Sequence, residues 1–435
     1  MTIVYIILTV LSVFLYLNKK YLSFILCYTA LMTELFMLDT IGSSIRGSDL
    51  CLFMNFILLP VALSRRNKDK IIDKETNKVI KLFIGFIIFE FALTFLTGAD
   101  TIGYALKVIR IPLIFLAYYP FSTIPLEIYK RFIKTMLIIT IIQGVLFLLQ
   151  FVGINLLAGR FDTDTFAFTF ALNIPTFIYF YIFFSLDAQY IKKYKYPLLA
   201  FFFVILLLTF VRTIIIALLA CVIIYIVTIR GFKRSMPIIL SLVIIAPIVM
   251  GVLEKKSTVS GSSMSTKDEI ALLFSGIDGI RRIGKDGGSS IFRLAMLIER
   301  FDYLIENPQY LLFGVGAIHE DSPKCFNRFN FTLGTYNEER KYGFCLIESG
   351  DITWVPVALR YGLVGIAIHL FILITIARLA RKRKDVLRIL FPLIVLFFIK
   401  SFSGPLFERP TGCFELVIYL SLLTRCITEK KELIM

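Results

Sequence analysis

Two arginines in the longest polar stretch of the chain have the spacing to bind an anion together. Arg293 and Arg300 are seven residues apart in a segment whose apolar residues recur at helical intervals. They should therefore share one face of a helix, about 10 Å apart along its axis. No carboxylate stands three or four residues from either one, the spacing at which side chains of one helix meet. Each guanidinium either pairs with an acid elsewhere in this stretch or grips an anion through its planar donor fork.

Three titratable residues follow that helix and could move a proton. Glu348 and Asp351 directly precede the next apolar run, and a carboxylate with a suitable pKa can act as a general base. His319 lies earlier, in the same polar stretch. It is either a catalytic residue or an ordinary loop histidine.

Charged residues also stand within apolar runs, where a charge is costly and is usually functional or paired. Glu90 and Lys107 lie at similar depth on either side of the short turn at 98–101, so we expect them to pair. Arg110 then has no evident partner and is a candidate for a substrate cavity. Three more arginines, each of which either snorkels to lipid phosphate or binds substrate, stand near the ends of apolar runs: Arg212, Arg360 and Arg409.

The composition indicates that the elements carrying these residues belong in a membrane. Of the 435 residues 58% are apolar and 18% are charged, and the mean hydropathy is +0.82. These values exclude a cytosolic enzyme, a secreted disulfide scaffold and a disordered chain. The net charge of +16 is concentrated in loops and does not indicate nucleic-acid binding. Seven cysteines form no CxxC motif and no cluster with histidine, so we expect neither a metal site nor a cofactor.

Apolar runs that reach or approach the length of a membrane span occur about 13 times. Crossing a hydrocarbon layer of about 30 Å takes about 20 residues of helix, and backbone in lipid must be helical to satisfy its own polar groups. We therefore predict an all-α polytopic integral membrane protein. The runs begin near Ile3, Tyr21, Leu50, Val79, Ile102, Phe132, Phe166, Pro197, Thr213, Ser235, Ile352, Leu387 and Thr411.

Basic residues alternate from loop to loop and predict the orientation of these helices. Lys and Arg gather in the cytoplasmic loops of membrane proteins, which places the N-terminus outside and the C-terminus inside. This predicts helices 1–10 over residues 1–253, a large external loop containing helices over 254–351, and helices 11–13 with a basic cytoplasmic tail over 352–435. The basic segments are Asn18–Lys20, Ser64–Lys78, Lys130–Arg131, Lys192–Lys195, Arg230–Arg234, Arg381–Lys384 and Lys430–Lys431.

Cys325 and Cys345 are the one cysteine pair wholly within the predicted external loop. Thiols outside the cytoplasm tend to oxidise. The pair forms either a disulfide or two separate buried thiols.

The order of motifs in and around this loop resembles the O-antigen polymerase and ligase family. A helix with arginines is followed by Asn307-Pro308, Phe313-Gly314-Val315-Gly316, a polar stretch, Glu348-Ser349-Gly350-Asp351 and Tyr361-Gly362-Leu363-Val364-Gly365. Phe210-Val211-Arg212-Thr213, at an external turn between two apolar runs, is similar to the family's Ser-Arg or Thr-Arg turn.

The resemblance implies a glycosyltransferase of the bacterial plasma (inner) membrane with an external active site. Such an enzyme polymerises undecaprenyl-pyrophosphate-linked repeat units of O-antigen, capsule or exopolysaccharide without metal, nucleotide sugar or other cofactor. Its partners would be the lipid-linked donor and acceptor glycans, membrane lipids, and a flippase and a chain-length regulator of the same pathway. Arg212, Arg293 and Arg300 would hold the pyrophosphate, whose developing charge needs stabilisation, and Asp351 or Glu348 would be the base.

Two alternatives remain beside the polymerase. A ligase of this family transfers finished glycan to a lipid core and carries a histidine just before the helix that follows the loop. Here that place reads Ser349-Gly350-Asp351, and His319 comes too early for that role, so polymerase is favoured. The alternative from another class is a lipid-linked glycan flippase, a transporter that would be expected to show two related halves and no long external loop.

Overall fold

The fold is given by a computed structural model that describes most of the two ends of the chain. The described residues are 2–33, 46–69, 73–149, 193–208, 289–329, 331–333, 352–381, 384–402 and 406–429, with residues 347 and 404 and short pieces between 154 and 280. The spans expected near Phe166 and Thr213, and most of the one near Ser235, lie outside them. So do Arg212, Cys345, Glu348 and Asp351.

Ten of the thirteen predicted runs fall within the described residues, and each of them is helical. The all-α class is thereby confirmed. Up to residue 208 the elements are α1 (Thr2–Leu17), α2 (Tyr21–Met32), α3 (Gly47–Lys68), α4 (Lys74–Leu96), α5 (Ile102–Ile109), the 3-10 helix η1 (Pro112–Ala117), α6 (Tyr118–Ser122), α7 (Leu126–Leu149), the two-residue antiparallel strands β1 (Phe161–Asp162) and β2 (Ala167–Phe168), and α9 (Lys195–Leu208). Then follow α14 (Ser289–Glu306), η3 (Pro308–Tyr310), α15 (Pro323–Arg328), α16 (Trp354–Arg381), α17 (Lys384–Ser401) and α18 (Pro410–Glu429).

Five of these helices are long and apolar enough to cross a membrane, namely α3, α4, α7, α16 and α18. A sixth span forms if α5 and the η1–α6 segment are taken together, although they are bent by 49°. The break falls before Pro112, whose missing N–H and rigid ring interrupt a helix. The described part of the chain is therefore a polytopic membrane protein, and the number of 13 spans stays a prediction.

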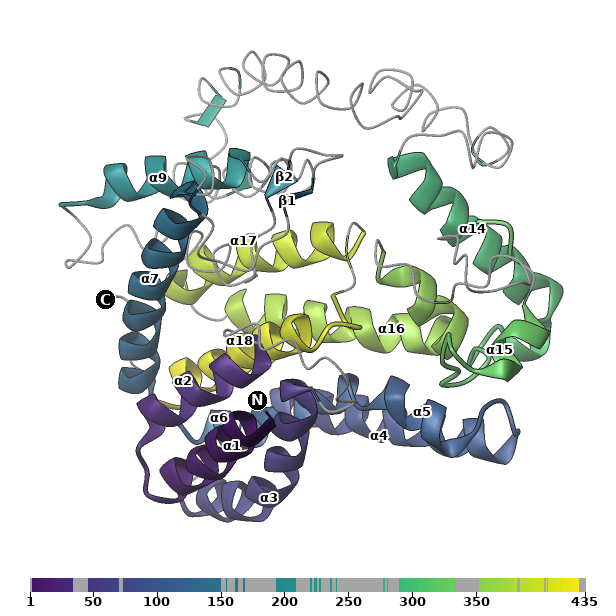
Figure 1. Cartoon of the computed structure of the whole chain (residues 1–435), viewed down its shortest axis with the longest axis horizontal. Helices are drawn as coiled ribbons and strands as arrows, with labels where there is room; N and C mark the ends of the chain where they lie inside the picture. The colour runs from purple at the N-terminus through teal and green to yellow at the C-terminus, as the bar shows by residue number, and fades with distance from the viewer. Residues whose placement is uncertain are drawn as a thin grey trace.

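α16 lies near the middle of the molecule (Figure 1) and contacts α4, α14, α17 and α18. α14 and α15 lie beside one end of α16 and α4. Helix α14 ends where the sequence predicts, because Pro308 cannot continue it.

Contacts between helices join helix ends that the alternation of basic loops places on the same side of the membrane. Arg65, at the end of α3, donates to the Leu17 carbonyl at 2.9 Å, which joins two ends that the alternation places on one side. Arg378 of α16 forms an ion pair with Glu75 of α4 at 3.2 Å on that same side. Which of the two sides faces outward stays a prediction.

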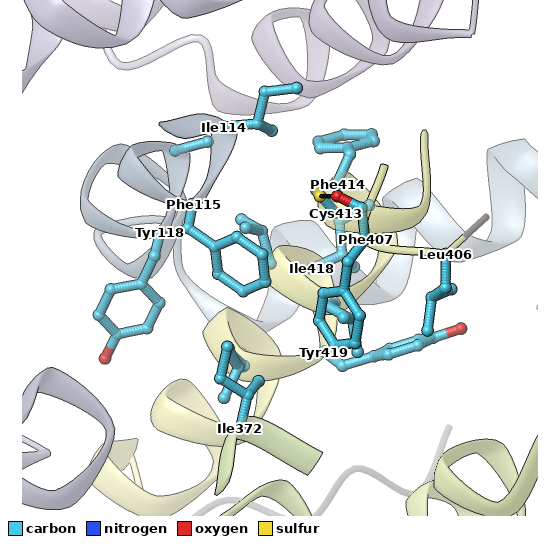
Figure 2. Packing of buried hydrophobic residues seen from close by; sticks show 14 of the residues in the cluster. Ile114, Phe115, Tyr118, Ile372, Leu406, Phe407, Cys413, Phe414, Ile418 and Tyr419 are labelled. Atoms are coloured by element: carbon cyan, nitrogen blue, oxygen red, sulfur yellow. Dashed lines mark hydrogen bonds between the residues drawn. The ribbon is translucent and has the colours of Figure 1, made fainter. Parts of the chain in front are cut away.

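Aromatic and aliphatic residues of η1, α6, α16 and α18 fill the centre of the bundle. Figure 2 shows Phe115 and Tyr118 on one side and Phe407, Phe414 and Ile418 on the other, all of them buried. A hydrogen bond from the Cys413 Sγ to the Phe407 carbonyl, 3.3 Å long, ties the start of α18 to the segment before it. The centre of the bundle thus fixes the segment at 406–409, which carries charged residues described next.

Candidate functional site

The two glycine motifs of the sequence form one structural unit. α16 is interrupted at Gly362, whose φ of 60° and ψ of −160° are not helical. At this break the backbone of α16 makes four hydrogen bonds to the loop at 311–316. The four bonds run from Leu363 N to Leu311 O, Val364 N to Leu312 O, Val315 N to Leu359 O and Gly316 N to Arg360 O, at 2.9–3.0 Å. The Phe-Gly-Val-Gly segment is therefore inserted between two turns of α16.

Glycine is required at three positions of this unit because a Cβ there would collide with a neighbouring segment. A Cβ on Gly314 would lie 2.3 Å from the carbonyl carbon of Arg360, and one on Gly362 would lie 2.5 Å from that of Leu312. A Cβ on Gly316 would lie 2.7 Å from the Thr94 hydroxyl. All three also have positive φ, which favours glycine.

The last turn of α4 and the turn between α4 and α5 hold the next part of the same loop. The Thr94 hydroxyl accepts a hydrogen bond from Ala317 N at 2.7 Å. The Asp100 carboxylate accepts from His319 N at 2.9 Å and from the Ser322 hydroxyl at 2.5 Å. These contacts join the turn at 98–101 to the large loop, two segments that the alternation predicts to be external.

A buried ion pair stands beside the inserted loop. The Arg360 Nη1 donates to the Glu408 Oε1 at 2.7 Å, and the Arg360 Nε donates to the Ile318 carbonyl at 3.0 Å. The Arg360 side chain is 2% exposed and that of Glu408 is 12% exposed. The pair therefore joins α16, the large loop and the segment before α18.

Both broken helices contribute to a small cavity at this pair. Its volume of about 20 Å³ would hold about one water molecule rather than a sugar ring. Irregular backbone within a membrane protein is tolerated where it is buried or lines such a cavity. The lining residues are Val108, Ile111, Pro112, Val357, Arg360, Tyr361, His369, Phe407 and Glu408.

His369, on the cavity wall, is held by aromatic rings on three sides. Its ring stacks on Tyr361 with centroids 5.8 Å apart and meets Phe83 and Phe407 edge to face at 5.1 and 4.7 Å. Its Nδ1 is 2.7 Å from the Gly365 carbonyl. The imidazole is thus fixed in orientation, and the residue escaped the sequence analysis although a histidine within a span is a signal for function.

The expectation that Arg300 lacks a partner on its own helix is wrong. Its guanidinium forms an ion pair with Glu299, the preceding residue, and donates from Nη2 to the Leu333 carbonyl at 2.7 Å. It also lies over the Phe331 ring, 4.1 Å from the centroid. The side chain is fully buried, so these contacts indicate a structural role. Arg293 lies half-buried on the same helix.

The expected pairing of Glu90 with Lys107 is also wrong. Lys107 Nζ lies 4.8 Å from the centroid of the Tyr104 ring, and neither Glu90 oxygen has a hydrogen-bond partner within the described residues. Arg110, for which no partner was expected, pairs with Asp49 of α3 at 3.0 Å. Arg110 stands at the end of α5, directly before η1, and η1 packs against α3.

The remaining candidates lie close to the inserted loop or outside the described residues. His319 follows the residue that accepts the Arg360 hydrogen bond, and its ring stacks on Tyr104 with centroids 5.8 Å apart. Arg409 is exposed and follows Glu408 directly. The structure thus brings Arg360, His319 and Arg409 to one end of the bundle.

The acids of this end were missed by the sequence analysis. Asp100 and Glu408 stand in short loops. The signals available in the sequence were that Asp100 lies near Gly98 and that Glu408 directly precedes Arg409.

Cys325 is buried, while the proposed disulfide partner Cys345 lies outside the described residues, so that pairing stays a prediction. Within the described residues no group of three or more His, Cys, Asp or Glu side chains could hold a metal ion.

The fold and the site define a polytopic α-helical membrane protein with an inserted glycine loop and a buried Arg–Glu pair at one end of its bundle. Residues 197–370 match the family model described as O-antigen ligase. This match supports membership of the O-antigen polymerase and ligase family and confirms the resemblance in the sequence. Members of that family are membrane enzymes that process glycans. A search of curated proteins finds no match to the chain.

Proposed function

We propose that the chain is a glycosyltransferase that polymerises undecaprenyl-pyrophosphate-linked oligosaccharide repeat units at the external face of the bacterial inner membrane. The observation that carries the proposal is the insertion of the Phe-Gly-Val-Gly loop into α16, inside the segment that matches the family. This unit stands beside Arg360 and Arg409, at the end of the bundle that also holds the large loop.

In the proposed reaction a hydroxyl of the acceptor glycan attacks the anomeric carbon of the donor. The new C–O bond forms as the bond to the pyrophosphate breaks, the hydroxyl proton passes to a carboxylate, and the lipid pyrophosphate leaves. Asp351 or Glu348 is the proposed base. The leaving group carries the charge that develops, so its stabilisation by fixed cations lowers the barrier.

Arg409, Arg293 and Arg212 are the proposed pyrophosphate-binding residues. Arg409 is exposed next to the buried pair, and Arg293 is half-buried on α14. Arg360 is proposed as a positioning residue, because its bonds to Glu408 and to the Ile318 carbonyl fix the segment that carries Arg409. Arg300 is left out of this set because its guanidinium is buried against its own loop.

The test is the glycan profile of a deletion strain that carries the wild-type chain or a variant. We expect the empty strain to make a product with a single repeat unit. Bare lipid core would instead indicate a ligase, the activity that the matched family's description names, and lipid-linked units trapped inside would indicate a flippase. Either result would overturn the polymerase.

The arginines are tested in the same strain. Arg293→Ala and Arg409→Ala should each shorten the polymer, and Lys at either position should restore it poorly, because Lys lacks the two-pronged fork. Arg131→Ala is the matched control, since Arg131 is exposed on α7 at the other end of the bundle, and it should leave the length unchanged. Full-length polymer from the Arg293→Ala, Arg409→Ala double variant, at normal membrane levels, would remove both from the site.

A further inference from the structure

The tip of the large loop carries exposed apolar side chains beside a membrane span. Leu312 is 55% exposed and Phe313 is 36% exposed. Leu363 of α16, whose N–H bonds to the Leu311 carbonyl, is 42% exposed next to them. A contiguous apolar surface of this kind indicates contact with an apolar partner.

Two helices give the depth of this surface within the bundle. The Phe313 ring packs edge to face on the Phe89 ring of α4, with centroids 5.5 Å apart. Phe89 is seven residues, or about 10 Å, before the end of α4 at Leu96. Gly362, where the loop enters α16, is eight residues, or about 12 Å, beyond its start at Trp354. Both helices therefore place Phe313 well inside the apolar length of a span, although the sequence places it in an external loop.

The loop backbone next to the tip is suited to this depth because many of its polar groups are already bonded within the protein. Each of the six consecutive N–H groups from Gly314 to His319 donates to an acceptor within the protein. The carbonyls of Leu311 and Leu312 accept from α16. Non-helical backbone can enter a bilayer only when its groups are satisfied in this way.

The lipid acyl chain is the partner that fits this surface. Ile88 and Phe89 on α4 and Leu363 on α16 are exposed on helices that are long and apolar enough to span a membrane. The loop surface is continuous with these residues through the Phe89–Phe313 contact. In the chain just before the tip Glu306 and Gln309 are exposed, and such polar side chains suit the headgroup layer.

We propose that Leu312 and Phe313 are inserted into the bilayer and contact acyl chains of the leaflet nearest the large loop. The segment inserted into α16 is then a membrane-embedded element rather than a loop above the surface. The proposal depends only on the packing of the chain and not on the reaction assigned to it.

Quenching of tryptophan by brominated lipid tests the insertion. Trp354 is the one tryptophan of the chain, so a Trp354→Phe background makes a single new tryptophan the only emitter. The full-length chain with Phe313→Trp, or with Leu312→Trp as a second variant, is reconstituted in palmitoyl-oleoyl phosphatidylcholine vesicles. Matched vesicles contain phosphatidylcholine brominated in the middle of one acyl chain.

Leu363→Trp serves as the reference within a span, and Asp321→Trp as the reference for the polar part of the loop. We expect Phe313→Trp and Leu312→Trp to lose the same fraction of their emission to brominated chains as Leu363→Trp. Quenching equal to that of Asp321→Trp in both variants would overturn the proposal. A second copy of the chain covering the surface would also overturn it, and would appear as quenching that rises when the protein is diluted in lipid.

Discussion

Removal of one charge from the Arg360–Glu408 pair should destabilise the whole chain. The two charged groups are 2.7 Å apart and almost fully buried. At that distance, with an effective dielectric constant of about 20, their gross attraction is about 6 kcal/mol, much of which offsets the loss of hydration. Removing one partner leaves the other charge buried and uncompensated, which typically costs about 3–5 kcal/mol. We therefore expect Arg360→Met and Glu408→Gln each to lower the free energy of unfolding by about that amount.

The double variant separates the ion pair from the other contacts of Arg360. In Arg360→Met, Glu408→Gln no charge remains to be compensated, so the loss should be smaller than the sum of the two single losses by about 1–3 kcal/mol. The loss of unfolding free energy that the double variant still shows measures the missing hydrogen bond to the Ile318 carbonyl. The measurement is denaturant unfolding of the purified full chain in mixed micelles.

An exposed pair on the opposite side of the bundle is the matched control. Arg378 and Glu75 also join two helices, at 3.2 Å, but both side chains are well exposed. Arg378→Met should therefore cost about 1 kcal/mol or less. The reasoning is refuted if Arg360→Met and Glu408→Gln are no more destabilising than Arg378→Met, or if their effects simply add.

Two further predictions concern the inserted loop and the orientation of the chain. Gly316→Ala should cost about 1–3 kcal/mol, because the residue has a positive φ of 92° and the new Cβ meets an α4 hydroxyl. Gly103→Ala, where nothing lies within 4 Å, should be neutral or slightly stabilising in the same unfolding assay. A reporter active only outside the cytoplasm should be active when fused after Asn327 and silent when fused after Lys384, and the reverse pattern at either site would contradict the orientation.

Local patterns were sufficient to predict the elements that carry the site. Length and hydropathy identify a span without reference to its neighbours, since the bilayer itself sets the requirement. The periodic apolar residues of 291–305 and the stop at Pro308 predicted α14, because both signals lie in neighbouring residues. The break at Pro112 also has a local cause, a proline within the run, although we predicted that run as one straight span.

The partners of charged residues could not be predicted, because they come from distant parts of the chain. Arg110 reaches Asp49 because the chain that follows α5 packs against α3, and Glu90 does not pair with Lys107, the partner expected for it. The i±3 and i±4 neighbours of Arg300 left two partners open, an acid elsewhere in the stretch or an anion, and the family resemblance favoured the anion. Its observed partners are the adjacent Glu299 and a backbone carbonyl more than thirty residues away.

The sequence by itself determined that this is an all-α membrane protein, that its short loops alternate in charge, and that its motifs follow the order of the O-antigen polymerase and ligase family. Each of these properties can be recognised from residues that are close together in the sequence. Only the tertiary structure decided that Phe-Gly-Val-Gly and the glycines of α16 form one unit, and that Arg360 is paired with Glu408. The first relation depends on hydrogen bonds between backbones some fifty residues apart, and the second is an ion pair between side chains 48 residues apart. The residue pattern of one segment alone does not show which distant segment will pair with it.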